Sequence, residues 1–372
     1  MDIQSRHLNN LKKMTGKKKK SFFNKKISSK TSLALVFFLF LISFGLIIIT
    51  YVNCDVQFGS NIVHNEKLCK FRNILTGLCV DSKEDENIWP IALMIDNNPD
   101  AWPQFGISKA DLVYSTLVEG GATRFMAVFT SKQLSKIGPV RSARPYYLTW
   151  AKGVDALYGH SGGSAEAIQK IKEYGILNLE EATNYGPKYF WRDDTGGYYA
   201  PHNLFTSSSR LEKARQDFEL SGQKLDYMSW FFNSRPTLSE ESGQEIEIDY
   251  SPGVLFDVEY IYSTSTNSYL RYQNESPHID ALDNSQVSTK TLIIQFVPEE
   301  KHLDVEDRLR IDTIGQGDAL VFIYGKKVEA KWKKESVISR TKFYTLDDTD
   351  IIFAPGNIWI EVVPENREVI IN

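Results

Sequence analysis

The most prominent feature of the hydrophobic pattern is one long apolar run near the N-terminus. Residues 31–52, TSLALVFFLFLISFGLIIITYV, carry no charge, and a helix needs roughly 20 apolar residues to cross a bilayer. This pattern predicts a transmembrane helix over 31–52. The rest of the chain has shorter apolar runs separated by turn-forming residues, which is typical of a globular body.

The apolar runs of the first half of the body predict an α/β domain over residues 87–225. The run WPIALMID predicts a buried strand that ends at Asp96. The segment DLVYSTLVEGGATRFMAVFT predicts a β-hairpin with its turn at Gly120-Gly121. The segment VDALYGHSGGSAEAIQKIKEYGI predicts a strand, a glycine-rich turn and a helix capped by Ser164, and another helix is predicted from about Ser208.

The second half has the pattern of a β-sheet. The runs VLFDVEYIYS, YLRYQN, TLIIQFV, DALVFIY and KVEAKWKK are β-prone and closely spaced. They predict a smaller β-rich domain over residues 251–366, whose Arg271, His278 and Asp280 are candidates to face the first domain. The polar, acidic segment 226–250 is predicted to link the domains. The expected fold is α/β or α+β: an N-terminal membrane helix, an α/β first domain and a smaller β-rich C-terminal domain.

Charge is distributed unevenly on the two sides of the apolar run. Residues 1–30 carry Arg6 and nine lysines against the single acid Asp2, whereas the whole chain has a formal net charge of -4. Basic residues before a span favour a cytoplasmic N-terminus, so we expect a single-pass protein of the cell membrane with its body outside the cytoplasm. An acidic body is a poor nucleic-acid binder. A cleaved signal peptide is the alternative, but ITYVNC lacks the small residues of a cleavage site.

The three cysteines, Cys54, Cys69 and Cys79, all lie in residues 53–86, which we interpret as an extracytoplasmic linker. A disulfide between Cys69 and Cys79 would close a short loop in an oxidising compartment. Two unpaired buried thiols are the alternative. No C-x-x-C motif or pair of nearby histidines accompanies them, so neither a metal site nor a cofactor is predicted. Asn53 precedes Cys54, which disfavours lipidation there.

Polar side chains gather at the predicted strand ends and loops of the first domain. In IGPVRSARPYYLTW, two prolines restrict the backbone around Arg141 and Arg144, and preorganised guanidinium groups suit carboxylates or phosphates. The helix start behind Gly162-Gly163 offers backbone N–H groups to an anion. The predicted ligand-binding residues are Asp96, Asn97, Glu119, Arg124, Arg141, Arg144, His160, Gly162, Gly163, Arg192, His202 and Asn203.

Structural interpretations of these residues stay open beside the functional one. Arg141 and Arg144 could pair with acids of the body, and Glu119 with Arg124 could form a surface ion pair at the hairpin turn. His160 could be a structural hydrogen-bonding residue. The aromatic residues of YFWRDDTGGYYAPHNLF suit sugar rings, but they suit the core of a loop equally well.

A catalytic interpretation also has sequence support. Gly159, Ser161 and Gly163 match G-x-S-x-G, followed by Asp193 or Asp194 and then His202, in the chain order of α/β-hydrolases. The segment from Ile88 to Tyr227 is too short for the usual hydrolase sheet, and no separate oxyanion loop is present. A hydrolase that uses His160 or His202 with Asp96 or Glu119 as acid and base is the enzyme alternative.

Several long segments resemble a known family. PIALMIDNNPDAWPQFGISKADLVYSTLVEGGATRFMAVF, IGPVRSARPYYLTWA, YGHSGGSAEAI and YAPHNLFTS closely resemble the N-terminal half of the YerB-like extracytoplasmic proteins, which contain a domain of unknown function numbered 3048. YLRYQNESPHID, TIGQGDALVFIYGKKVEAKWKK and FAPGNIWIEVVP resemble its C-terminal half. The resemblance covers Leu75 to Pro364 and implies a bacterial envelope protein, usually a lipoprotein, without implying an activity. The uncleaved span and the missing lipobox depart from that pattern.

The residues and the resemblance together predict a membrane-anchored extracytoplasmic protein that binds an anionic or glycan component of the envelope, such as peptidoglycan. In this hypothesis Arg141 and Arg144 hold acidic groups of the ligand. The envelope hydrolase is one alternative. An assembly or regulatory partner of other envelope proteins is the other.

Overall fold

The structure is a computed structural model that describes residues 69–372 except 131, 226–229, 234–243, 251–252 and 305. The predicted tail 1–30, the predicted span 31–52 and Cys54 lie outside the described residues. Within the described part of the chain, no helix is both long and apolar enough to cross a bilayer. The segment from Cys69 to Asn372 forms one compact unit.

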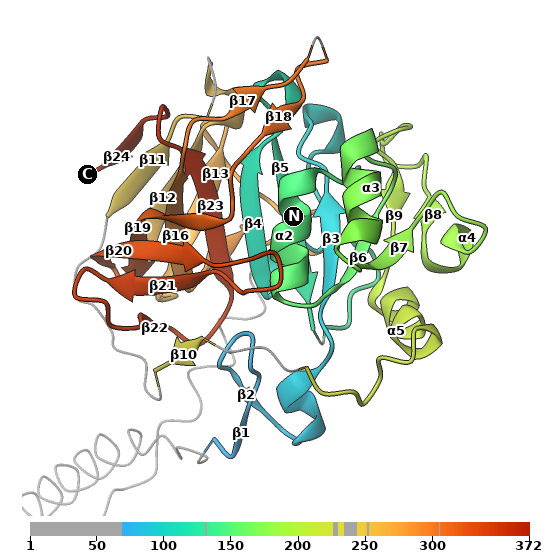
Figure 1. The fold of residues 1–372 in the computed structure, drawn as a ribbon, viewed down its shortest axis with the longest axis horizontal. Coiled ribbons are helices and arrows are strands. Elements are labelled where there is room, and N and C mark those ends of the chain that lie inside the picture. Colours follow the sequence, from blue (N-terminus) through green and yellow to red (C-terminus); the bar gives the residue numbers. More distant parts are fainter. Residues whose placement is uncertain (1–68, 131, 226–229, 234–243, 251–252, 305) are drawn as a thin grey trace, which may run out of the picture. The chain divides into compact units, whose positions relative to one another are not determined.

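A ten-stranded mixed sheet runs through this unit (Figure 1). Its order is β21-β20-β19-β16-β23-β4-β5-β3-β6-β7. The bounds are β3 Ile91–Ile95, β4 Leu112–Leu117, β5 Thr123–Phe129, β6 Leu157–His160, β7 Leu177–Glu180, β16 Thr291–Val297, β19 Gly315–Ile323, β20 Lys326–Lys334, β21 Lys342–Thr345 and β23 Ile358–Pro364. Every residue of β3, β4 and β5 is buried, as expected for apolar strands covered on both faces.

The two halves of the chain share this sheet. Strand β23, from the second half, pairs in parallel with β4 of the first half and with β16 of its own half. The sequence predicted an α/β first domain and a smaller β-rich domain, and in the structure the two halves share one sheet because β23, buried along its whole length, has strand partners on both edges. The mixed α/β class and the β-rich character of the C-terminal part are confirmed. The domain boundaries stay predictions.

The predicted hairpin is confirmed as β4 and β5, which pair antiparallel from Leu112↔Val128 to Leu117↔Thr123. Its turn is the 3-10 helix η4, Glu119–Gly121. Both Gly120 and Gly121 have φ of 70°, a backbone conformation that glycine adopts without steric cost. The turn therefore fixes Glu119 immediately beside the strand ends.

The helices lie mainly in the first half, with bounds α2 Pro145–Gly153, α3 Ala165–Glu173, α4 Gly186–Tyr189 and α5 Ser208–Asp217. Helices α2 and α3 lie side by side in front of the sheet (Figure 1), where Trp150 of α2 stacks on Tyr114 of β4 with ring centroids 4.7 Å apart. The predicted cap of α3 is confirmed, because the Ser164 side chain accepts a hydrogen bond from the Ala167 N–H at 3.2 Å.

A second, antiparallel sheet accounts for much of the β-rich part. Its order is β14-β13-β12-β11-β24, with β15 also on β13. The bounds are β11 Glu245–Ile248, β12 Val258–Ser263, β13 Ser268–Gln273, β14 Ser276–Pro277, β15 Ser288–Thr289 and β24 Val369–Ile371.

Short pairs join β1 Phe71–Arg72 to β2 Cys79–Val80, β8 Trp191–Arg192 to β9 Leu204–Phe205, β10 Phe231–Phe232 to β22 Ile352–Phe353, and β17 Lys301–His302 to β18 Leu309–Arg310. The other 3-10 helices are η1 Glu84–Asn87, η2 Pro99–Ala101, η3 Ile107–Lys109 and η5 Val254–Phe256.

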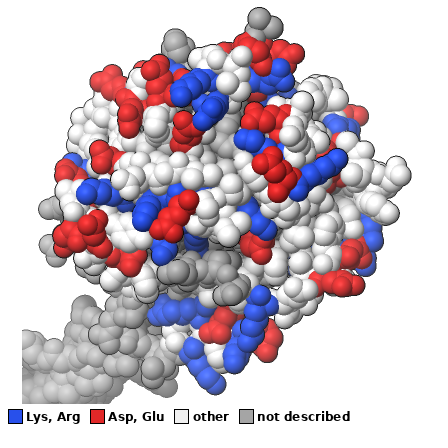
Figure 2. Space-filling model, viewed as in Figure 1, with Lys and Arg blue, Asp and Glu red and all other residues white. Residues whose placement is uncertain are grey.

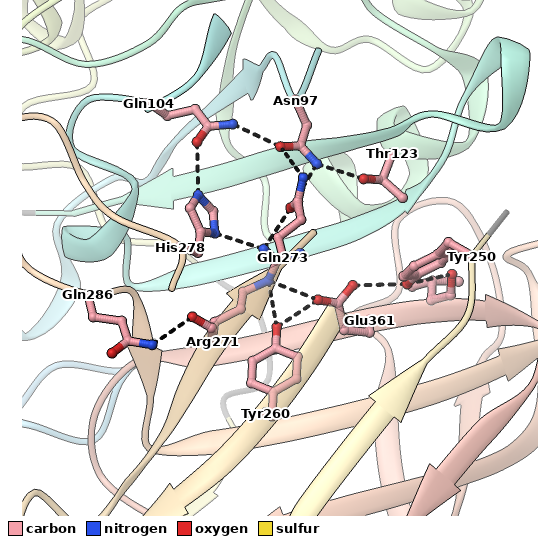
Figure 3. Close-up of polar contacts among 11 residues, drawn as sticks. Asn97, Gln104, Thr123, Tyr250, Tyr260, Arg271, Gln273, His278, Gln286 and Glu361 are labelled. Carbon is pink, nitrogen blue, oxygen red and sulfur yellow. Dashed lines mark hydrogen bonds and ion pairs between the residues drawn. The ribbon is translucent and has the colours of Figure 1, made fainter. Parts of the chain in front are cut away.

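A buried polar network connects the two halves (Figure 3). The Arg271 side chain is fully buried, and its Nε lies 3.4 Å from Oε1 of the equally buried Glu361. Its NH1 donates to Gln273 Oε1 at 2.8 Å and to His278 Nδ1 at 2.7 Å. Tyr260 donates to Glu361 at 2.6 Å. The only full charges in this cluster are thus one cation and one anion that neutralise each other.

The network continues from His278 into the first half. Because His278 Nδ1 accepts from Arg271, Nε2 carries the proton and donates to Gln104 Oε1 at 2.8 Å. Burial, aided by the charge of Arg271, lowers the pKa of His278 well below its usual value, so the ring is neutral. Gln104 donates in turn to Asn97 Oδ1 at 2.9 Å. As expected, Arg271 and His278 face the first half of the chain. They do so through buried contacts and not across an open cleft.

The predicted disulfide is present between Cys69 and Cys79, with their Cα atoms 5.5 Å apart. It links the ends of the β1–β2 hairpin at the start of the described chain. Replacing both cysteines with alanine is expected to lower the free energy of unfolding by about 2–3 kcal/mol, because the unfolded chain loses a cross-link over a short loop. Calorimetry of the oxidised protein and the double variant measures this change. Equal melting temperatures would contradict a stabilising role.

Candidate ligand-binding groove

A groove of about 470 Å³ lies where the β4–β5 turn, the segment 141–144 and the start of α3 meet. Its lining mixes charged and small polar residues from both halves of the chain. The lining residues are Asp96, Asn98, Val118, Glu119, Ala122, Thr123, Arg124, Arg141, Ser142, Arg144, Gly163, Ser164, Ala165, Glu306 and Arg308. Six of the twelve residues predicted from sequence are among them.

The segment that carries Arg141 and Arg144 is held by backbone hydrogen bonds on two sides. The Arg141 N–H donates to the carbonyl of Met94 in β3 at 2.9 Å, and the Ser161 N–H donates to the Arg141 carbonyl at 3.0 Å. The Ala143 N–H donates to the Gly162 carbonyl at 2.9 Å. The two arginines therefore project from a backbone fixed between the end of β3 and the β6–α3 turn. This is the restricted backbone that the flanking prolines predicted.

Arg144 pairs with Glu119 through two parallel contacts. Its Nε lies 2.5 Å from Oε1 and its NH2 lies 2.7 Å from Oε2, while NH1 donates to the Ala143 carbonyl at 2.8 Å. Burial alone would raise the pKa of Glu119, but the hydrogen bonds from Arg144 outweigh it and the pKa is lowered. Internal pairing is thus the correct interpretation for Arg144. The Glu119 partner is Arg144 and not Arg124, which corrects the ion pair considered from sequence.

Arg141 is held by Asp96 but is still accessible. Its Nε lies 3.0 Å from Asp96 Oδ2, and its side chain is 25% exposed. Among the described residues its Nε has no hydrogen-bond partner, so the contact with Asp96 is an ion pair by distance. Asp96 Oδ2 also contacts His202 Nδ1 at 2.7 Å. His202 is thus linked to the groove through Asp96, which also contacts Arg141.

Arg124, on β5, differs from the other arginines of the groove. The residue is 7% exposed, and its NH1 donates to the Ser142 carbonyl at 3.1 Å. Its Nε has no hydrogen-bond partner, and no carboxylate of the described chain lies within ion-pair distance of it. Burial lowers its pKa, and the nearby charge of Arg144 lowers it further. A guanidinium stays protonated despite such shifts, so Arg124 is a buried cation without an anion.

The other predicted site residues lie outside the groove. His160 is fully buried, with Nδ1 2.8 Å from the Gly162 carbonyl and Nε2 2.7 Å from Asn178 Oδ1, which matches its structural interpretation. The Gly162 N–H donates to Glu180 Oε1 at 2.7 Å. The expectation that this N–H is available to an anion is therefore wrong, since a side chain already accepts from it. Asn97 belongs to the buried network (Figure 3).

Arg192 and Asn203 form a separate contact. Arg192 NH1 donates to Asn203 Oδ1 at 2.9 Å, and its NH2 lies 3.3 Å from Glu181 Oε1. The neighbouring aromatic residues pack on one another: Tyr198 and Phe205 have ring centroids 5.6 Å apart. Neither of these aromatic rings lines the groove. The packing of Tyr198 and Phe205 supports the loop-core interpretation for these two rings, whereas Tyr199 of the same segment is 69% exposed.

The residues of the G-x-S-x-G hypothesis do not come together as a triad. Ser161 Oγ donates to Glu181 Oε2 at 2.9 Å, Asp193 pairs with Lys136 at 2.8 Å, and His202 pairs with Asp96. Each member thus has a different partner. The described residues also contain no group of three or more His, Cys, Asp or Glu side chains arranged to hold a metal ion.

Nine of the fifteen groove residues were not predicted, and among them Glu306 and Arg308 are charged. These two residues belong to the loop between β17 and β18, from the second half of the chain. This loop docks on the β4–β5 turn, where the Gly120 N–H donates to Asp307 Oδ2 at 2.9 Å. Nothing in the local sequence signals a contact between residues 187 positions apart.

Comparison with known proteins identifies the protein family of this chain. The N-terminal domain model of a family described as "Protein of unknown function (DUF3048)" matches residues 75–221, and its C-terminal domain model matches residues 238–360. The chain belongs to this DUF3048 family. It is 31% identical over 301 residues to "Putative lipoprotein YerB" of Bacillus subtilis, covering 80% of this chain and 87% of that one. The crystal structure of the YerB protein from Bacillus subtilis matches with a TM-score of 0.71 and 29% identity, covering 81% of this chain and all of that one.

Proposed function

We propose that this protein binds an anionic, glycan-containing component of the bacterial cell envelope in the groove. The apolar run over residues 31–52 and the basic residues before it support anchoring in the cell membrane with the body outside the cytoplasm. The name of the Bacillus subtilis relative, a lipoprotein, is consistent with a membrane-attached envelope protein.

The observation that carries this proposal is the convergence of arginines on a rigid backbone with donor groups left over. The Arg141 side chain is 25% exposed and contacts Asp96 through Nε, and Arg124 lines the groove without a carboxylate partner among the described residues. Guanidinium groups held in place bind carboxylate and phosphate groups through charge-assisted hydrogen bonds. The polar side chains of Thr123, Ser142 and Ser164 add partners for hydroxyl groups of a sugar.

The surface charge supports a local site and not a broad polyanion surface. On the face shown in Figure 2, Lys and Arg side chains alternate with Asp and Glu side chains and form no continuous basic area. Proteins that bind nucleic acids neutralise many phosphates at once. A mixed surface with a few inward arginines instead suits a ligand that presents isolated negative charges.

Binding is favoured over hydrolysis because the carboxylates of the groove are already engaged. Asp96 contacts both Arg141 and His202, and Glu119 contacts Arg144 through both oxygens. A general base has to be within reach of a substrate proton and able to accept it, and the hydrogen bonds from Arg144 lower the pKa of Glu119 and make it a weaker base. The proposal therefore assigns Asp96 and Glu119 to holding arginines.

The test replaces Arg141 with glutamine in the full-length protein in detergent. We expect its affinity for purified muropeptides to fall at least about tenfold, because charge-assisted hydrogen bonds are lost. Isothermal titration calorimetry measures the change. Arg192→Gln is the matched control, since Arg192 is a partly exposed arginine outside the groove, and it should bind like the wild type.

Two outcomes would contradict the proposal. One is a wild-type protein that binds neither muropeptides nor teichoic-acid fragments at low ionic strength, where charge interactions are strongest. The other is binding that Arg141→Gln and Arg192→Gln weaken equally.

A further inference from the structure

We infer that the groove recognises a single carboxylate group, and that Arg124 together with the start of α3 is the subsite that binds it. This inference rests on the proposed function and specifies the ligand chemistry. The inferred ligand carries one negative charge at this position, on a planar acidic group such as the carboxylate of a sugar acid.

The charges of the inner groove are unbalanced by one. Its inner charged side chains, each at most 25% exposed, are three arginines and two carboxylates. Arg141 is matched by Asp96, and Arg144 is matched by Glu119. At the rim, Arg308 is paired with Asp304 and Glu306. Among the inner side chains Arg124 is left over, so one ligand anion would balance the inner charges, whereas a dianion would leave an excess negative charge there.

A second buried arginine shows what a purely structural one looks like. Arg215, on α5, is also 7% exposed. Its Nε donates to the Trp89 carbonyl at 2.8 Å, its NH1 to Glu212 Oε2 at 2.9 Å and its NH2 to the Thr130 carbonyl at 2.6 Å. Every nitrogen of Arg215 is therefore satisfied, including one by a carboxylate. Arg124 has the same burial but no carboxylate partner among the described residues, and a buried charge without a counterion is costly unless something binds to it.

The start of α3 faces the same space. Gly163, Ser164 and Ala165 line the groove with Arg124, and α3 is nine residues long. The Ala165 N–H is at the first helical position, and it has no acceptor among the described residues. Helix N-termini attract anions through such N–H groups and the helix dipole. An arginine without a carboxylate partner and a helix start thus line the same groove.

A carboxylate fits this position better than a phosphate monoester. A carboxylate brings one charge, while a phosphate monoester brings close to two at neutral pH. The same groove already shows the expected geometry, because the two oxygens of Glu119 bind two nitrogens of Arg144 side by side. Planar guanidinium and carboxylate groups match in this way.

The experiment measures three small probes on the full-length protein by calorimetry. N-acetylmuramic acid carries one carboxylate, N-acetylglucosamine is the neutral counterpart, and N-acetylglucosamine 1-phosphate carries a phosphate monoester. We expect N-acetylmuramic acid to bind at least about tenfold more tightly than either of the others. Arg124→Gln should abolish that preference and keep a melting temperature equal to or above that of the wild type, since it removes an uncompensated buried charge.

Arg215→Gln is the matched control for burial. It should retain the preference for N-acetylmuramic acid and melt at a lower temperature than the wild type. A phosphate probe that binds more tightly than N-acetylmuramic acid and is lost in Arg141→Gln would overturn the inference while leaving the proposed function in place. A carboxylate preference that persists in Arg124→Gln would also overturn it. If neither the acidic probes nor muropeptides bind the wild type, both the inference and the proposed function fail.

Discussion

Replacing Arg271 with methionine is expected to reduce the free energy of unfolding by about 3–5 kcal/mol, because it leaves a buried carboxylate without its cation. Arg271 and Glu361 are both fully buried and 3.4 Å apart. The same change removes the donor to His278, which connects the second half to Gln104 of the first. Denaturant unfolding monitored by tryptophan fluorescence measures the loss.

A second cation at the surface provides the comparison. Arg310 is 61% exposed and pairs with Asp312, and exposed pairs of this kind contribute about 1 kcal/mol or less. Arg310→Met should therefore leave the unfolding curve almost unchanged. The double variant Arg271→Met with Glu361→Gln should recover part of the loss, since it removes the orphaned charge. A loss in Arg271→Met no greater than in Arg310→Met would show that the network does not join the halves energetically.

Replacing Lys334 with methionine is expected to stabilise the protein at pH 7 by about 2–4 kcal/mol, because a desolvated ammonium is removed from the interior. Lys334, at the end of β20, is fully buried, and its Nζ donates to the carbonyls of Val337, at 3.3 Å, and Ser339. Burial lowers the pKa of Lys334 to about 7. The loss of the two hydrogen bonds offsets part of the gain.

The pH dependence distinguishes this effect from a simple change in packing. The folded-state pKa of Lys334, about 7, lies below the ordinary lysine value of 10.5, so between these two pH values the unfolded chain binds more protons. Stability of the wild type should therefore rise with pH across this window, by up to about 1.4 kcal/mol per pH unit from this group. Below pH 7 both states are protonated and the cost is complete.

Unfolding curves from pH 6 to pH 9.5 on the wild type and on Lys334→Met would measure this difference. The neighbouring Lys333 is an exposed partner of Glu335, at 2.9 Å, so Lys333→Met is the control and should keep the wild-type slope. If Lys334→Met shows the same dependence of stability on pH as the wild type, then burial does not lower the pKa of Lys334 in the folded protein.

Features encoded by neighbouring residues could be predicted from the sequence. The β4–β5 hairpin follows from two apolar runs around Gly120-Gly121, and the start of α3 follows from Ser164 before an amphipathic segment. The Cys69–Cys79 disulfide follows from a short loop in an oxidising compartment. Each of these depends on fewer than about 25 consecutive residues, where periodicity and turn chemistry determine the structure.

Features that depend on pairing between distant segments could not be predicted. An apolar run such as Ile358–Pro364 signals a buried strand but not its neighbours, so the insertion of β23 beside β4 was missed. The choice of Arg144 and not Arg124 as the partner of Glu119 is decided by side-chain geometry across 25 residues. That choice leaves Arg124 without a carboxylate partner among the described residues. The contact of the β17–β18 loop with Gly120 is equally long-range.

The contrast between local features, which the sequence predicts, and long-range contacts, which it does not, matters most for the candidate site. Sequence identified residue types suited to anion binding, and half of them line one groove. It could not separate arginines that are neutralised internally from those with free donors, because both kinds occupy similar loops and strand ends. His160 and Gly162 show the same limit: their surroundings in sequence look functional, yet their polar atoms are satisfied within the fold.

The measurement that tests the central claim most directly is a structure of the full-length protein with bound N-acetylmuramic acid. The account predicts the sugar in the groove, with its carboxylate between Arg124 and the Ala165 N–H and within reach of Arg141. A sugar bound elsewhere on the molecule, with these three groups making no contact to it, would contradict the account.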